Sequence, residues 1–302
     1  MNEKTKTSKQ LFLLILPFIV LCFLFAYFPL HGWIYSFFDY KPPRSLFQSE
    51  YVGLKWFKTL FANKTQISQL MQVMRNTFAM SLLGVLTSIF PVAFALFLNE
   101  IKCKWYKGLV QTLTTLPNFI SWVLVYAIAF SIFSTNGMLN TILQNMGVIT
   151  DPIKFLDSDN HTWLWMIAWY VWKGLGWGAI MYLASISSID VQLYEAAKVD
   201  GASRFQVMKS ITLPAMLPIF FVLLMLSIAN FLNNGIDQYY VFQNAFNRQH
   251  IQVLDLYVYN VGMTGNNLSL ATAISMLKSI ISVTLLTIAN IVSKKTRGES
   301  IV

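Results

Sequence analysis

Long apolar stretches separated by short polar connectors run through most of the 302-residue chain. A helix rises about 1.5 Å per residue, so about 20 apolar residues cross a hydrocarbon core of roughly 30 Å. Six stretches come close to that length or exceed it: Leu11–Ile34, Phe78–Leu98, Leu109–Phe133, Trp163–Ala184, Pro214–Phe231 and Ser269–Val292. The pattern predicts an all-α, polytopic membrane protein with six transmembrane helices.

Composition agrees with a membrane protein. Apolar residues make up 56% of the chain and charged residues only 12%, whereas a soluble domain carries about 25% charged residues. The net charge of +9 would suggest nucleic acid for a soluble protein. Here the bases gather between apolar stretches, so membrane lipid and cytoplasmic protein are the expected partners, and nucleic acid is not. Cys22 and Cys103 show no metal or disulfide spacing, and we expect no metal site.

The distribution of Lys and Arg predicts the orientation. Alternation places four basic stretches on one side, and short basic loops face the cytoplasm. These stretches hold Lys4, Lys6 and Lys9; Lys102, Lys104 and Lys107; Lys198, Arg204 and Lys209; and Lys294, Lys295 and Arg297. We expect cytoplasmic tails at residues 1–10 and 294–302 and a membrane domain at residues 11–293.

One loop conflicts with this orientation. Residues 35–75 should lie outside, yet they contain six bases and two acids. Leu54, Trp56, Phe57, Leu60 and Phe61 have roughly helical spacing, which predicts a segment lying along the outer membrane interface.

The cytoplasmic stretch 185–214 carries capping signals for two short helices. Asp190 can cap a helix over Val191–Val199, and Gly201 falls where a helix end needs a left-handed residue. Ser203 and Gln206 then have the form of a capping box. Pro214 falls in the first turn of the next span, where its missing N–H costs little. The stretch predicts a helix, a tight turn and a second helix near the membrane surface.

Two interpretations of this element remain open from its residues alone. Small and aromatic side chains surrounded by charged ones form a knob that a soluble partner could receive in a cleft. The same residues would also suit a solvated connector. The surface consists of Tyr194, Ala197 and Gly201, with Glu195, Lys198, Asp200 and Arg204 around it.

The element also resembles a known family. Glu195-Ala196-Ala197, three residues, Gly201, nine residues and Ile211-Thr212-Leu213-Pro214 match the pattern E-A-A-x3-G-x9-I-x-L-P. This is the EAA loop of permeases from binding-protein-dependent ABC importers. Weaker matches extend over about residues 10–295, among them Val52–Phe57, Leu116–Trp122 and Trp172–Gly178, and resemble the polysaccharide branch of maltose-type permeases. The resemblance implies a type I importer permease whose coupling helix seats on an ATPase.

The resemblance also implies the residues and partners of transport. ATPase coupling would fall to Glu195, Ala196, Ala197, Asp200, Gly201, Arg204 and Pro214. Expected partners are a second homologous permease subunit, two copies of an ABC ATPase and an extracellular solute-binding lipoprotein. The chain has no phosphate-binding loop, so we expect a non-catalytic subunit without a cofactor, with ATP and Mg on the ATPase. The expected location is the bacterial plasma membrane, and the expected cargo is an oligosaccharide or glycan fragment moved by alternating access.

Polar residues inside the spans are candidates for the substrate path. Ser227, Asn230, Asn233 and Asn234 end the fifth span, and on a continuous helix residues 227, 230 and 234 share one face. Amides can bind sugar hydroxyls, but they can also join helices. The further candidates are Trp122, Tyr126, Lys173 and Trp177. An ion-coupled secondary transporter is the alternative function, although no acidic residue falls inside a predicted span.

Overall fold

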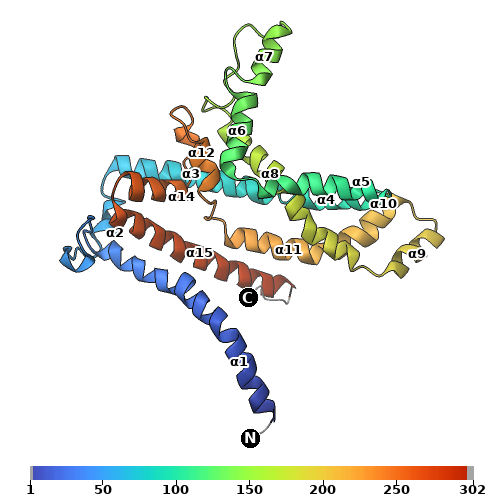
Figure 1. The fold of residues 1–302 in the computed structure, drawn as a ribbon, viewed down its shortest axis with the longest axis horizontal. Helices are drawn as coiled ribbons and strands as arrows, with labels where there is room; N and C mark the ends of the chain where they lie inside the picture. The colour runs from blue at the N-terminus through green and yellow to red at the C-terminus, as the bar shows by residue number, and fades with distance from the viewer. Residues whose placement is uncertain (1–2, 298–302) are drawn as a thin grey trace. The chain divides into compact units, whose positions relative to one another are not determined.

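The chain folds into helices joined by short turns. A computed structural model describes residues 3–297 (Figure 1). Within them the extended pairing is an isolated bridge between Phe38 and Tyr51. The α-helices are α1 Glu3–Cys22, α2 Lys55–Thr59, α3 Lys64–Thr87, α4 Ile89–Glu100, α5 Lys104–Thr115, α6 Trp122–Phe133, α7 Met138–Asn145, α8 Thr162–Ser187, α9 Val191–Val199, α10 Arg204–Val207, α11 Leu213–Ala229, α12 Asp237–Phe242, α13 Arg248–Ile251, α14 Leu254–Tyr259 and α15 Leu268–Arg297. The all-α prediction is confirmed.

Short π-helical and 3-10 helical segments connect several of the α-helices. Turns of π-helix occupy Phe23–Tyr27, Met208–Thr212 and Asn260–Thr264, and 3-10 helices occupy Phe28–Phe37, Leu46–Gln48 and Leu116–Phe119. Two of the 3-10 helices carry Pro in their first turn, at Pro29 and Pro117. Proline lacks the N–H of the regular ladder, so a change of pitch at these points is expected.

Five helical segments of the described residues are long and apolar enough to cross a membrane. They are Leu11–Phe37, Lys64–Glu100, Trp122–Asn145, Arg204–Ala229 and Leu268–Lys295. α8 is a sixth long helix, and its 26 residues extend about 39 Å. It is not among the five most apolar segments, and it carries Lys173 together with Gly174, Gly176 and Gly178.

The predicted third span is not one helix. We expected Leu109–Phe133 to be continuous, but the chain breaks after Thr115 and restarts as α6 at Trp122. Pro117 disrupts the helical ladder, and the Ser121 side chain then caps α6 by accepting from the Leu124 N–H at 3.4 Å. The predicted second span is longer than expected, because α3 begins at Lys64.

The described residues form two compact units. One contains the chain up to Ile67 together with Val258–Lys278, and the other contains Ser68–Tyr257 together with the chain from Ser279. In the second unit α4, α5 and α11 pack against α8, and α12 packs against α6 (Figure 1). One apolar core there includes Val92, Tyr182 and Met216, and another includes Val125, Tyr239 and Ile251. These cores position the walls of the cavity described next.

Candidate functional site

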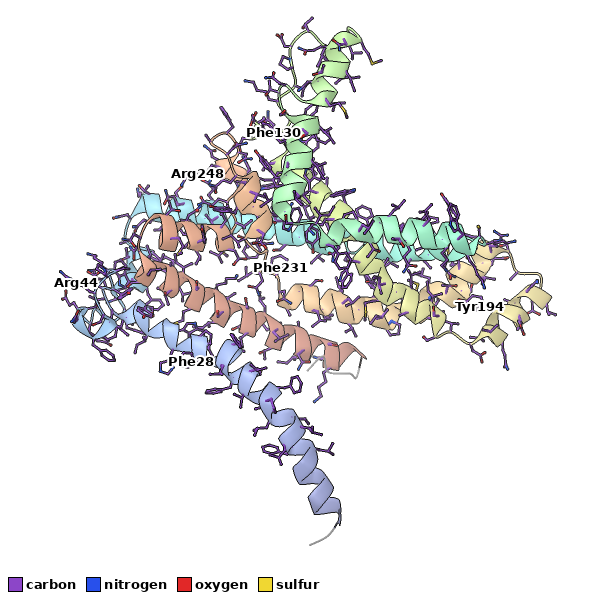
Figure 2. The ribbon with its side chains drawn as sticks, viewed as in Figure 1. Phe28, Arg44, Phe130, Tyr194, Phe231 and Arg248 are labelled. Atoms are coloured by element: carbon purple, nitrogen blue, oxygen red, sulfur yellow. The ribbon has the colours of Figure 1, made fainter. Side chains whose placement is uncertain are left out.

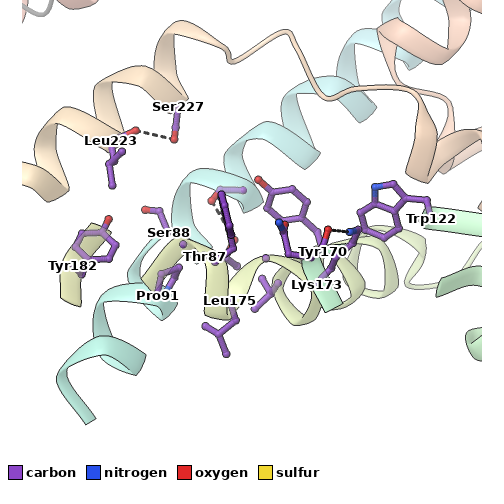
Figure 3. A pocket seen from close by; sticks show the side chains of 16 residues that line it. Thr87, Ser88, Pro91, Trp122, Tyr170, Lys173, Leu175, Tyr182, Leu223 and Ser227 are labelled. Carbon is purple, nitrogen blue, oxygen red and sulfur yellow. Dashed lines mark hydrogen bonds between the residues drawn. The ribbon is translucent and has the colours of Figure 1, made fainter. Parts of the chain in front are cut away.

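The second unit contains a cavity of about 470 Å³ beside α8, α3 and α11 (Figure 3). A second cavity of about 350 Å³ shares Gly84, Tyr170, Leu223 and Ser227 with it. The two hollows are therefore parts of one continuous groove, which we call the polar groove. Its lining includes hydroxyls, amides and aromatic rings, and among the lining residues Lys173 carries the charge.

The asparagine-rich end of α11 lies on the polar groove. Ser227, Asn230, Asn233 and Asn234 all line it. α11 ends at Ala229, so the prediction of one helical face through residue 234 is wrong. Asn230 instead caps the helix end, and Gly235 adopts a positive φ of 75° just beyond. The turn still brings the three amides to the same wall.

The hydrogen bonds of these amides leave one acceptor without a partner. Asn230 donates to the Leu226 carbonyl at 3.0 Å, and Asn233 donates to the Asn230 side chain at 3.2 Å. The Asn234 amide nitrogen donates to the Ser81 hydroxyl at 3.0 Å, while its Oδ1 is buried and has no hydrogen-bond partner. A buried amide oxygen without a donor is costly, so a rotation of the Asn234 side chain that turned this oxygen into the groove would let it accept a hydrogen bond there.

Among the described residues, no acid pairs with Lys173. Its ammonium donates to the carbonyls of Asn118 at 2.7 Å and Pro117 at 3.1 Å, and it lies 5.5 Å from the centre of the Trp122 ring (Figure 3). These carbonyls lie where the helical ladder is interrupted, and a cation at a helix C-terminal end is favourable. Lys173 thus fastens α8 to the break in the third span, at the edge of the polar groove.

The predicted aromatic residues divide into two groups. Trp122 and Trp177 line the polar groove, and Trp177 also packs edge-on against Phe119 at 5.7 Å between ring centres. Tyr126 is not among the residues that line the groove. It packs against the apolar core instead, with its ring 5.1 Å from that of Phe242. Tyr126 therefore lies apart from the polar groove.

Sequence reasoning missed the opposite wall. α3 contributes Ser81, Gly84 and Thr87, Ser88 follows at the junction with α4, and α8 contributes Tyr170 and Tyr182. Residues 81, 84 and 88 recur at helical spacing, so a run of small and polar positions in an otherwise apolar span was a usable signal.

The segment from Asp190 to Pro214 forms the predicted helix, turn and helix. The Asp190 carboxylate accepts from the Gln192 N–H at 2.9 Å and caps α9, which covers the predicted residues. Gly201 has a φ of 72°, and the Ala202 N–H donates to the Ala197 carbonyl, which completes a Schellman end. Ser203 and Gln206 form both bonds of the capping box, and Pro214 lies in the first turn of α11.

The segment from Asp190 to Pro214, which we call the coupling element, is largely exposed. Glu195, Ala196, Asp200, Gly201 and Arg204 are exposed, and Ala197 is half-buried. Sequence reasoning missed four large apolar side chains that are exposed on the same element, Val191, Leu193, Val199 and Phe205; the most exposed are Val199 at 88% and Phe205 at 67%. Exposed apolar groups beside charged ones favour a docking surface over a solvated connector.

One hydrogen bond ties the coupling element to the span that follows. The Tyr194 and Thr212 hydroxyls lie 3.1 Å apart, joining α9 to the residue before α11; Tyr194 is labelled in Figure 2. α11 then runs to Asn230 at the polar groove. The exposed coupling element and the polar groove thus lie at the two ends of one helix.

The comparisons define the family. The model of the binding-protein-dependent transport system inner membrane component matches residues 82–298, and the chain belongs to this family. It is therefore a membrane component of a transport system, and this membership supports an importer over the ion-coupled alternative.

Known relatives match nearly the whole chain. Protein LplB of Bacillus subtilis is 36% identical over 98% of this chain and 92% of its own length. The polygalacturonan/rhamnogalacturonan transport system permease protein YteP, from the same organism, is 37% identical over 97% and 90%. A chain of a bacterial alginate ABC transporter, crystallised in complex with an alginate pentasaccharide-bound periplasmic protein, superposes with a TM-score of 0.85 at 30% identity, covering 99% of this chain and 98% of that chain.

Proposed function

We propose that the chain is the permease subunit of an ATP-driven importer that carries an oligosaccharide or glycan fragment into the cytoplasm by alternating access. The observation that carries the choice of cargo is the polar groove. Its amides and hydroxyls suit the many hydroxyls of a sugar, and Trp122, Trp177 and Tyr170 offer faces on which sugar rings can stack. Relatives named for alginate and polygalacturonan transport support the same class of cargo.

The unpartnered acceptor on Asn234 defines the proposed contact most closely. Once the Asn234 side chain turned toward the groove, a sugar hydroxyl donating to its Oδ1 would satisfy an oxygen that has no partner. Ser227 and Asn230 lie along the same wall and would extend the contact. Lys173 donates to two backbone carbonyls, so we assign it the structural role of joining α8 to the break in the third span, rather than contact with the cargo.

The coupling element supplies the proposed route for ATP energy. Glu195, Ala196, Ala197, Asp200, Gly201 and Arg204 would seat on an ATPase subunit, with Pro214 starting the span above them. ATP-induced closure of two ATPase copies would move this element and its counterpart on a second, homologous permease subunit. The groove would then open toward a loaded extracellular binding lipoprotein, and hydrolysis would return it to the cytoplasm.

This assignment fixes the remaining features of the subunit. Residues 11–293 would form the transporting domain, with the tails 1–10 and 294–302 in the cytoplasm of a bacterial cell. ATP and Mg would bind on the ATPase, so the chain itself would need no cofactor.

Two sets of substitutions test cargo and coupling separately. In cells that contain the whole transporter, Asn230→Ala with Asn234→Ala should lower uptake of radiolabelled oligosaccharides about tenfold, since each lost hydrogen bond contributes about 0.5–1.5 kcal/mol. The ATPase should still co-purify with this variant. Asn145→Ala, an exposed asparagine on α7, is the matched control and should leave uptake unchanged.

The substitutions in the coupling element should differ from the first set in the co-purification of the ATPase. Glu195→Ala with Gly201→Val should abolish co-purification of the ATPase and should abolish uptake with it. The panel should include neutral and acidic oligosaccharides, such as maltotriose and trigalacturonate. Full uptake by both sets of variants would contradict the proposed function.

A further inference from the structure

The loop that follows the first apolar segment is strongly basic although the predicted orientation places it outside. Residues 38–64, which we call the basic platform, contain five bases, Lys41, Arg44, Lys55, Lys58 and Lys64, against Asp39 and Glu50. Basic loops of this size normally stay on the cytoplasmic side. The excess of basic residues in an outer loop therefore requires a separate explanation.

The basic platform is a folded structure. The Asp39 N–H donates to the Glu50 carbonyl at 2.9 Å beside the Phe38–Tyr51 bridge. The Trp56 indole donates to the Phe38 carbonyl at 2.9 Å, and the rings of Phe38 and Tyr51 lie edge-on at 5.3 Å. These contacts close the loop on itself, so its bases are held on a defined surface; Arg44 is labelled there in Figure 2.

The side chains on that surface are of two kinds. All five bases are exposed, and Lys41 with Asp39 forms the ion pair found among them, at 3.6 Å. Three large apolar side chains are exposed between the bases: Phe47 at 96%, Phe61 at 64% and Leu54 at 57%. Aromatic and basic residues together are the composition of a membrane interface, where rings enter the headgroup layer and cations remain in the polar zone.

Chain connectivity places the basic platform at the membrane surface. The apolar segment Leu11–Phe37 ends immediately before it, and the segment Lys64–Glu100 begins at its last residue. The N-terminal end of the platform is therefore anchored where the first span ends, and its C-terminal end leads into a helix whose apolar part begins at Phe78. Lys41 and Arg44 follow Phe37, the end of the first span, by four and seven residues, which keeps them near the layer of roughly 10 Å in which an anionic surface attracts charge.

We propose that the basic platform binds the anionic headgroups of phospholipids at the outer face of the membrane. Lys41, Arg44 and Lys58 bind headgroup phosphates, and Phe47 and Phe61 enter the layer beneath. This binding explains why the bases are retained on the side where short loops are normally poor in them. The inference rests on the proposed orientation with both termini inside, but not on the identity of the cargo.

Photocrosslinking from the platform itself tests the lipid preference. The full chain with Phe47→p-benzoylphenylalanine is reconstituted into vesicles of phosphatidylcholine with one-fifth phosphatidylglycerol, and the crosslinked lipid is identified by mass. Each base near an anionic surface favours it by a factor of about five. We expect the ratio of phosphatidylglycerol to phosphatidylcholine in the crosslinked lipid to be at least fivefold above the one-to-four ratio of the bilayer, so that phosphatidylglycerol makes up more than about half of it.

Charge variants show whether the bases cause this preference. Lys41→Gln, Arg44→Gln and Lys58→Gln together should return the crosslinked lipid to its bulk share. The charge-preserving set Lys41→Arg, Arg44→Lys and Lys58→Arg is the matched control and should keep the preference. A parent protein that crosslinks lipid at its bulk share, or a neutralised set that keeps the preference, would overturn the proposal.

A labelling experiment tests the side of the membrane. In a background where the exposed Cys22 and Cys103 are replaced by Ser, Phe47→Cys should react with a membrane-impermeant maleimide on intact cells. Val199→Cys, at a similarly exposed site of the coupling element, should react only after permeabilisation. The reverse pattern would overturn the outer-face location. Normal ATP-dependent uptake in the neutralised variant would leave the proposed transport function standing whatever the lipid result.

Discussion

Lys173 offers the sharpest test of how the third span is held at its break. Replacing it with Met removes the ammonium but keeps a side chain of similar length. The substitution leaves the Asn118 and Pro117 carbonyls without the charged donor that now lies 2.7 and 3.1 Å away. We therefore expect the segment from Asn118 to Leu124 to loosen, while α8 itself remains folded.

The magnitude follows from the two hydrogen bonds. Bonds to a charged donor contribute about 1.5–3 kcal/mol each when they are buried. Lys173 is half-buried at the edge of the polar groove, so water can replace part of this interaction, and we expect a loss of about 2 kcal/mol. A difference of 1.4 kcal/mol is a factor of ten in an equilibrium constant. Local opening of the break should therefore become roughly thirtyfold more frequent.

Hydrogen–deuterium exchange of the full chain in nanodiscs measures this opening. Amides of Ile120 and Leu124, which donate to the Pro117 carbonyl and the Ser121 hydroxyl, should exchange faster in Lys173→Met. Lys173→Arg retains donors and charge and should restore much of the protection. Lys154→Met, at an exposed lysine, is the control and should leave these amides unchanged.

The opposite result would assign a different role to the lysine. If Lys173→Met left exchange at the break unchanged but weakened uptake of acidic oligosaccharides selectively, the ammonium would be a ligand of the cargo. The fastening role would then be refuted.

Three further substitutions separate backbone constraints from side-chain contacts. Gly176→Ala would place a methyl group in steric overlap with the backbone of Thr114. Thermal unfolding in detergent should therefore show a loss of stability of about 1–3 kcal/mol. In the control Gly174→Ala the added methyl group meets nothing within 4 Å, so stability should be unchanged or higher. Gly201→Val forces a branched side chain into a φ of 72° and should weaken ATPase co-purification, while Gly201→Asn, which tolerates that backbone, should retain it. Ser203→Ala removes one capping-box bond and should raise exchange in α10 by about fivefold, for a loss of about 1 kcal/mol; unchanged exchange would show that tertiary contacts alone hold α10.

Much of the fold was predictable because a membrane enforces simple rules. Apolar length identified the long helices, and the capping residues Asp190, Gly201 and Ser203 predicted the coupling element in detail, since caps act over a few neighbouring residues. The break before Trp122 was not foreseen, although Pro117 marks it. A proline inside an apolar run can either kink a helix or end it, and the choice depends on a donor from another helix, here Lys173.

The groove was harder to predict than the coupling element. Asn230 and Asn234 could be selected as polar residues in an apolar stretch, but their common wall depends on a turn that sequence spacing treated as helix. Tyr126 illustrates the opposite difficulty. Nothing in its local sequence distinguishes a ring that faces a cavity from one that packs on Phe242, because that difference is set by α12, more than a hundred residues later.

The π-helical turn Met208–Thr212 sets the rotational phase between the coupling element and α11. Successive residues of an α-helix are about 100° apart around its axis. A one-residue deletion in this turn would therefore rotate α11 by about 100° relative to the coupling element. Ser227 and Asn230 would then point away from the groove. The number of residues between Gly201 and Pro214 thus determines which face of α11 points into the groove. Substitutions in this stretch should therefore be tolerated far better than insertions or deletions.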